Sequence, residues 1–256
     1  MIIYAFLSAI TGILGYKIHA LSRNGAIAAT GVGCAIALGF GWKGLLLLGI
    51  FFLTSTIWSK YKAQLKDGVE QIVEKSASRD QYQVLANGGV AAFAGIMMLL
   101  FPGDVWLFIF LSAIATSNSD TWASELGVLS KRRPLHIITM KFVPAGTSGA
   151  ISMPGILASL LGAGLIGGVG SLVFDLSFLG LVIVTVAGFV GCLSDTLIGA
   201  TLQEELKCQK CGSKTERHMH CGNRTVKING IKGFNNDVVN FASSMIGALV
   251  GGAWWL

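Results

Sequence analysis

Four acidic residues lie in or next to long apolar stretches, where charged side chains are rare. Asp120 and Glu125 belong to one stretch, Asp195 to a second and Asp237 to a third. A carboxylate at this depth in a bilayer costs several kcal/mol unless it is paired or binds a cation. Such residues therefore mark a functional site by default.

Polar residues one helical turn away share a face with these acids. Ser124 follows Asp120 at this spacing, and Asn240 follows Asn236. Thr121 and Glu125 form a similar pair. Three helices would thus present hard oxygen ligands at one depth, which is the donor set that Mg²⁺ takes while it keeps waters and a substrate phosphate. The alternative is that each acid caps a helix or pairs with a nearby basic residue, which applies most to Asp237, at an N-cap position, and to Glu125, which the aqueous loop could solvate.

A glycine-rich turn precedes the apolar stretch at 150–172 and combines free backbone N–H groups with two hydroxyls. A helix N-terminus behind such a turn would make an anion cradle, because free N–H groups and the helix dipole both favour negative charge. The alternative is an ordinary helix cap, and the turn matches neither a Walker A loop nor a G-x-G-x-x-G fingerprint. The turn residues are Gly146, Thr147, Ser148 and Gly149, with Lys131 and Lys141 as positive charges in the same loop.

A further polar patch opens the stretch at 84–101. Asp80, Gln83 and Asn87 fall on one helical face and would line the same cavity. The alternative is a helix start at the membrane interface, with Arg79 at the lipid headgroups.

Three cysteines and two histidines lie close together in the loop at 203–236. Cys208, Cys211 and Cys221, with His220 or His218, fit a Cys₃His zinc site, although the second half is not a C-x-x-C pair. Full ligation by protein groups predicts a structural zinc that orders the loop, and a reducing compartment disfavours disulfides.

The elements that must position these residues are membrane helices. Hydrophobic residues make up 53% of the 256-residue chain and charged residues 12%, and the mean hydropathy is +0.67. This composition predicts an all-α, polytopic helical bundle that forms a single integral-membrane domain over 1–256. Basic residues follow the first stretch, which argues against a cleaved signal peptide. We expect eight spans, or seven if the second and third divide differently: 2–20, 25–41, 43–59, 84–101, 104–123, 150–172, 178–202 and 237–256.

Basic residues fall almost entirely on one side of these spans. Only Lys43, of 19 Lys and Arg residues, lies opposite the loops at 60–83, 124–149 and 203–236. The positive-inside rule then places these loops and the acids at the cytoplasmic face of the cell membrane, and both termini outside. The net charge of +6 is therefore an insertion signal, and no nucleic-acid partner is expected.

Four motifs resemble an integral-membrane family that includes transmembrane protein 19 and plant phytyl-phosphate kinase, over nearly the whole chain. They are N-S-D-T-W-A-S-E-L-G from Asn118, P-A-G-T-S-G from Pro144, G-x-x-S-D-T-x-x-G-A-T from Gly191 and N-D-x-V-N from Asn236. The resemblance is most specific at the D-T-W-A-S-E run. Part of the pattern is also similar to dolichol kinase, phytol kinase and CDP-diacylglycerol synthase. Asn118 and Ser119 stand where many relatives have a small residue and Gly, and the Cys/His loop is not shared by all of them.

The resemblance implies a kinase that moves phosphate from a nucleoside triphosphate, with CTP the expected donor, to an isoprenyl monophosphate in the membrane. It assigns Mg²⁺ to Asp120, Asp195 and Asp237, phosphate binding to Lys131, Lys141 and the 146–149 turn, and orientation of nucleotide or metal to Asn118, Asn236 and Asn240. No general base is required, because a phosphate monoester is already an anionic nucleophile.

Three other functions remain open from the sequence. An ion-coupled transporter or lipid flippase would use the acids as a cation path, although such acids would lie near the midplane rather than at one end. A CTP-dependent lipid alcohol kinase or cytidylyltransferase would share the lipid and the nucleotide. A non-catalytic relative would have the same sequence pattern.

Overall fold

Long apolar stretches of the chain form helices, because backbone groups inside a bilayer must be hydrogen-bonded within the chain. The computed structural model of the protein describes residues 2–65 and 78–255. Residues 66–77 of the predicted loop at 60–83, and residue 256 of the last predicted span, lie outside the described residues. The α-helices are α1 (Ile2–Lys17), α2 (Arg23–Lys60), α4 (Gln81–Leu100), α5 (Asp104–Gly127), α6 (Met153–Phe174), α7 (Phe178–Thr201) and α8 (Asn236–Gly252).

The predicted all-α polytopic bundle is confirmed. Among the described residues, five helical segments are long and apolar enough to cross a membrane, namely α2, α4, α6, α7 and α8 with the short 3-10 helix Ala253–Trp255. Large apolar side chains are exposed along the outer faces of the bundle, as expected where lipid is the solvent. The chain is a multi-pass membrane protein.

Helix α2 reverses direction at Gly41, between the two spans predicted at 25–41 and 43–59. Gly41 has φ 59° and ψ −146°, a conformation outside the helical region that favours glycine. A Cβ on Gly33 would lie 3.6 Å from Cδ2 of Leu45, whereas residues 12 apart in a straight helix are separated by about 18 Å. The two halves of α2 therefore pack against each other.

Helix α5 is the central element and packs against α2, α4, α6, α7 and α8. Its polar residues bond to the surrounding helices. The Ser117 hydroxyl donates to the Asn87 carbonyl in α4, and the Ser119 hydroxyl to the Ser159 carbonyl in α6, both at 2.8 Å. Burial among other helices explains why α5 tolerates a polar composition that a lipid-facing helix would not.

Small residues allow α5, α7 and α8 to approach closely. The Thr116 side chain of α5 lies against Gly191 of α7 and Gly247 of α8, and a Cβ at either glycine would overlap it. Packing of this kind is a main source of helix association in membranes, where the hydrophobic effect between helices is lost.

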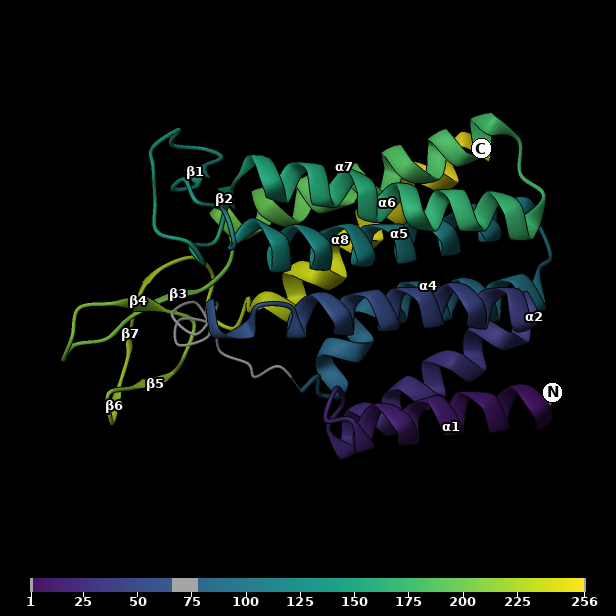
Figure 1. Cartoon of the computed structure of the whole chain (residues 1–256), viewed down its shortest axis with the longest axis horizontal. Helices are drawn as coiled ribbons and strands as arrows, with labels where there is room; N and C mark the ends of the chain where they lie inside the picture. Colours follow the sequence, from purple (N-terminus) through teal and green to yellow (C-terminus); the bar gives the residue numbers. More distant parts are fainter. Residues whose placement is uncertain (1, 66–77, 256) are drawn as a thin grey trace.

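Short strands lie at one end of the bundle, and both termini lie at the other end (Figure 1). The loop between α5 and α6 contains the antiparallel pair β1–β2, and the segment between α7 and α8 contains a three-stranded sheet, ordered β4-β3-β7, and the pair β5–β6. The strands are β1 (Leu135–His136), β2 (Ala150–Ile151), β3 (Glu205–Lys207), β4 (Lys214–Thr215), β5 (Met219–His220), β6 (Asn223–Arg224) and β7 (Val226–Asn229).

Candidate functional site

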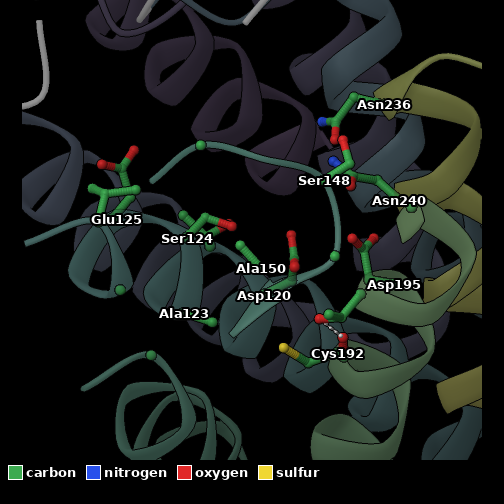
Figure 2. Close-up of a pocket in the computed structure, with 18 of the residues that line it drawn as sticks. Asp120, Ala123, Ser124, Glu125, Ser148, Ala150, Cys192, Asp195, Asn236 and Asn240 are labelled. Atoms are coloured by element: carbon green, nitrogen blue, oxygen red, sulfur yellow. Dashed lines mark hydrogen bonds between the residues drawn. The ribbon is translucent and has the colours of Figure 1, made fainter. Parts of the chain in front are cut away.

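A cavity of about 420 Å³ lies at the strand-bearing end of the bundle. Its walls are the end of α2, the start of α4, the last turns of α5, the 145–152 segment, α7 and the start of α8. Figure 2 shows the carboxylates of Asp120 and Asp195 projecting into this space, with Ser148 and Asn240 beside them. Three helices thus bring the predicted carboxylates Asp120, Asp195 and Asp237 to one cavity.

Asp195 of α7 is held by two residues of α8. The Ser243 hydroxyl donates to Asp195 Oδ2 at 2.9 Å. The Asn240 amide, in the orientation that satisfies its neighbours, donates to the same oxygen at 3.0 Å and to the Asn236 carbonyl at 3.3 Å. Both bonds end on Oδ2, so they fix the carboxylate while Oδ1 remains for a ligand in the cavity.

Asp120 and Asp237 approach the same space from α5 and α8. No described residue donates a hydrogen bond to Asp120, and its charge interacts with that of Asp195. Asp237 lies in the first turn of α8 but does not cap it. The N-cap is Asn235, whose Oδ1 accepts the Val238 N–H at 3.2 Å. The capping alternative for Asp237 is therefore excluded.

Glu125 and Arg79 also line the cavity. Ser59 of α2 donates to Glu125 Oε1 at 2.6 Å, so Glu125 belongs to the cavity rather than to the aqueous loop alone. Burial lowers the pKa of the Arg79 guanidinium, and the charge of Glu125 acts in the opposite direction. Arginine stays protonated in proteins, so Arg79 contributes a fixed positive charge.

The 146–149 turn lines the cavity, but not as the cap of a helix. Helix α6 begins at Met153, after β2, and its N-cap is Ser152, which accepts the Gly155 N–H. The expectation that the turn forms this N-terminus is wrong, because two strand residues intervene.

Two glycines shape the turn. Gly146 and Gly149 have φ of 84° and 80°, and a Cβ on Gly149 would overlap Ala200 of α7. The Thr147 hydroxyl donates to the Pro144 carbonyl at 2.8 Å. The N–H groups of Gly146, Ser148 and Gly149 donate to none of the other described residues, and all three residues line the cavity.

Three residues predicted for the site lie elsewhere. Asn118 is fully buried between helices, where its amide donates to the Gly162 carbonyl at 2.7 Å and accepts from the Thr54 hydroxyl at 3.0 Å. Lys131 and Lys141 are exposed and do not line the cavity. Neither of these two lysine side chains therefore supplies positive charge to the cavity. The remaining predicted residues that line the cavity are Asn87, Thr121, Ser124, Asn236 and Asn240.

Sequence reasoning did not predict several groups that line the cavity or support it. Ser59 and Glu216 line the cavity from distant segments of ordinary composition, and Ser243 bonds Asp195 from behind. Gln203 also lines the cavity, and its amide donates to Glu216 Oε1 at 2.7 Å. Ser243 could have been found from helical spacing, because it follows Asn236 by two turns and so lies on the same face of the helix.

The cavity carries a large excess of negative charge. Five carboxylates line it, from Asp120, Glu125, Asp195, Glu216 and Asp237, and Arg79 is the only lysine or arginine among the described residues that does so. A phosphate-bearing ligand cannot approach such a surface without cations to offset the repulsion. The donor set of carboxylate and amide oxygens suits Mg²⁺.

The four predicted zinc ligands are close together in the segment between α7 and α8. One ligand atom from each of Cys208, Cys211, His220 and Cys221 lies within 4.8 Å of the others. His218 is exposed and not part of this cluster.

Comparisons with known proteins agree with this architecture. The family model for integral membrane protein DUF92 matches residues 6–248. The chain is 31% identical to an uncharacterized membrane protein of Methanocaldococcus jannaschii, over 92% of this chain and 86% of that protein. It is 31% identical to Protein PGR of Arabidopsis thaliana, over 96% and 93%, and 28% identical to the chloroplastic Protein VTE6 of the same plant, over 90% and 64%. No solved structure matches the chain. The chain therefore belongs to the integral membrane protein family DUF92.

Proposed function

We propose that this protein is a membrane-embedded prenyl monophosphate kinase that uses a nucleoside triphosphate, with CTP the expected donor, and Mg²⁺. The observation that carries the proposal is the convergence of Asp120, Asp195 and Asp237 on one acidic cavity beside a turn with available N–H groups. The resemblance to plant phytyl-phosphate kinase supports the same class of reaction.

The three aspartates would hold Mg²⁺, and Asn240 and Ser243 would orient Asp195 toward it. When bound, Mg²⁺ neutralises phosphate oxygens and lowers the repulsion between two anionic reactants. The excess of five carboxylates over one guanidinium is what a site for metal-bound phosphates requires, because the cations restore the charge balance.

The reaction is a direct phosphoryl transfer. An oxygen of the prenyl monophosphate attacks the γ-phosphorus of the nucleoside triphosphate. A new P–O bond forms while the bond from the γ-phosphorus to the β,γ-bridging oxygen breaks, and the nucleoside diphosphate leaves. The protein then needs to position and stabilise charge rather than to move a proton. The N–H groups of the 146–149 turn and the Arg79 guanidinium are the donors for phosphate oxygens.

A groove between α4 and α8 provides a place for the prenyl chain. It is lined by apolar side chains that include Leu85, Val238 and Phe241, and it meets the cavity at Asn235 and Asp237. Gly89 lies in this groove, where a Cβ would only touch the Phe241 ring, at 3.7 Å, and a larger side chain would fill the space. A lipid lying here would enter from the bilayer with its phosphate at the carboxylates.

The test is phosphate transfer by the purified protein in detergent or nanodiscs. The reaction contains Mg²⁺, one of CTP, ATP or UTP, and prenyl monophosphates of increasing length, and mass spectrometry detects the diphosphate. We expect diphosphate from the wild type, and a loss of at least 100-fold in Asp120→Asn and Asp195→Asn. Asp104→Asn is the matched control, because Asp104 is exposed at the opposite end of α5 from Asp120.

Two results would contradict the proposal. One is the absence of product with every pair of nucleotide and prenyl phosphate. The other is full turnover in both aspartate variants. Cation-coupled uptake of lipid or solute in sealed vesicles, lost in the same variants, would favour the transporter instead.

A further inference from the structure

A second cluster of chemically active side chains lies outside the cavity, in the segment between α7 and α8. Three thiols and one imidazole gather there, from Cys208, Cys211, Cys221 and His220, with ligand atoms within 4.8 Å of one another. The distances from His220 Nδ1 are 3.5 Å to Cys211 Sγ and 3.3 Å to Cys221 Sγ. All of the cysteines are free thiols.

The two sulfur–nitrogen separations are close to the edge length of a tetrahedral metal site. With Zn–S near 2.3 Å and Zn–N near 2.0–2.1 Å, the ligand atoms of a tetrahedron lie about 3.6 Å apart for S and N, and about 3.8 Å apart for two sulfurs. Hydrogen bonding alone would not bring three thiols around one imidazole, since thiols are weak donors.

Two tight turns bring the four ligand residues together. In the first, between β3 and β4, the Cys208 N–H donates to the Ser213 carbonyl and the Gly212 N–H to the Cys208 carbonyl, both at 2.9 Å. In the second, between β5 and β6, Cys221 and Gly222 both have positive φ, at 53° and 79°. Each turn offers two ligands, because Cys211 joins Cys208 in the first and His220 joins Cys221 in the second.

We propose that Cys208, Cys211, His220 and Cys221 bind one structural Zn²⁺ through three thiolates and the Nδ1 atom of His220. Four protein ligands fill the tetrahedral shell, which leaves no position for a substrate or a reactive water. Strands of two to four residues bury little apolar surface, so a bound metal would explain why this segment is ordered.

The same segment forms part of the cavity wall. Glu216 follows β4 directly, lines the cavity and accepts a hydrogen bond from Gln203 at 2.7 Å. The zinc would therefore hold Glu216 against the cavity without taking part in the chemistry there.

The experiment measures metal content in the full-length protein, purified without chelators and with an affinity tag that lacks histidine. Inductively coupled plasma mass spectrometry should find one zinc per chain. After dialysis against a chelator that leaves wild-type zinc in place, Cys211→Ser, Cys221→Ser and His220→Ala should retain less than a tenth of it. His218→Ala and Cys34→Ser are the matched controls and should retain one zinc.

A spectroscopic measurement on the wild type avoids dependence on variants that fail to fold. Replacement of the bound metal by Co²⁺ should give the intense visible bands of tetrahedral cobalt together with a thiolate charge-transfer band. The proposal is overturned if the wild type contains no zinc and takes none from added Zn²⁺, or if another metal occupies the site as purified. It is also overturned if His218→Ala loses the metal while His220→Ala keeps it, or if mass spectrometry finds a disulfide among the three cysteines.

Discussion

Replacing Ser243 by alanine tests whether Asp195 is a cation ligand held in place by α8. The Ser243 hydroxyl is buried and has a single hydrogen, which lies within reach of two acceptors, Asp195 Oδ2 and the Asn240 carbonyl, each at 2.9 Å. The Ser243→Ala substitution removes this donor without opening a cavity. Asp195 then keeps only the Asn240 amide as a fixed partner among the described residues.

The expected magnitude follows from this shared hydrogen. A hydrogen bond to a charged group contributes about 1.5–3 kcal/mol, and sharing one hydrogen between two acceptors reduces this to about 1 kcal/mol. At about 1.4 kcal/mol for each factor of ten, the Mg²⁺ concentration for half-maximal turnover should rise about 5-fold. The turnover rate at saturating Mg²⁺ should change less than 3-fold, because Ser243 lies behind Asp195 and does not line the cavity.

The assay follows diphosphate formation against free Mg²⁺, and the rise of the Tm with Mg²⁺ provides a second readout that needs no substrate. Ser244→Ala is the matched control. Ser244 is the next residue of the same helix and is fully buried, but its hydroxyl bonds to no described residue. The reasoning is refuted if Ser243→Ala leaves the Mg²⁺ dependence within 2-fold of the wild type, or if Ser244→Ala shifts it equally.

Three further substitutions test the packing, the turn and the groove. Asn118→Ala should lower the free energy of unfolding in detergent by about 1–3 kcal/mol, because two interhelical hydrogen bonds are lost, while the Mg²⁺ dependence stays unchanged. Gly149→Ala should abolish turnover and Gly233→Ala should not; both glycines have φ near 80°, so backbone strain is matched and only Gly149 meets a neighbouring helix. Gly89→Leu should raise KM for the prenyl phosphate at least 10-fold and leave KM for the nucleotide unchanged, whereas Gly89→Ala should behave as the wild type because a Cβ only touches the Phe241 ring. The expectation for Asn118 is contradicted if Asn118→Ala unfolds like the wild type. The other two are contradicted if Gly149→Ala and Gly233→Ala lose turnover equally, or if Gly89→Leu and Gly89→Ala have the same KM for the prenyl phosphate.

The sequence could locate the carboxylates of the cavity but not its positive charge. Asp120 and Asp195 stand out because an apolar helix gives a charged residue no ordinary reason to be there. Lys131 and Lys141 were predicted to bind phosphate but do not line the cavity. The positive-inside rule concerns the side of the membrane on which basic loops lie and does not say which of their side chains reach a cavity. The backbone of Arg79 is held in place, because its N–H donates to the Ala20 carbonyl, its carbonyl accepts the Ser22 N–H, and α4 starts two residues later.

Contacts between distant segments were also beyond the sequence. Ser59 meets Glu125, 66 residues away, only because α2 folds back on itself and returns to the same end of the bundle. Asn118 has the composition of a site residue, but its amide bonds helix to helix. A polar residue in a membrane helix serves either a cavity or a neighbouring helix, and periodicity alone does not distinguish the two.

The reversal at Gly41 also determines whether α2 counts as one crossing of the membrane or as two. Had α2 continued straight, every element after it would face the opposite leaflet from the one it now faces relative to α1. The arginine and lysine residues after α2 would then lie on the opposite side of the membrane from Lys17 and Arg23. The two groups would favour opposite orientations under the positive-inside rule. Lys43, two residues past the reversal, lies over the Phe174 ring at 5.3 Å, where its charge is stabilised at the far end of the bundle. The reversal at this one glycine is therefore a condition for the single insertion orientation that the positive-inside rule predicts from the sequence.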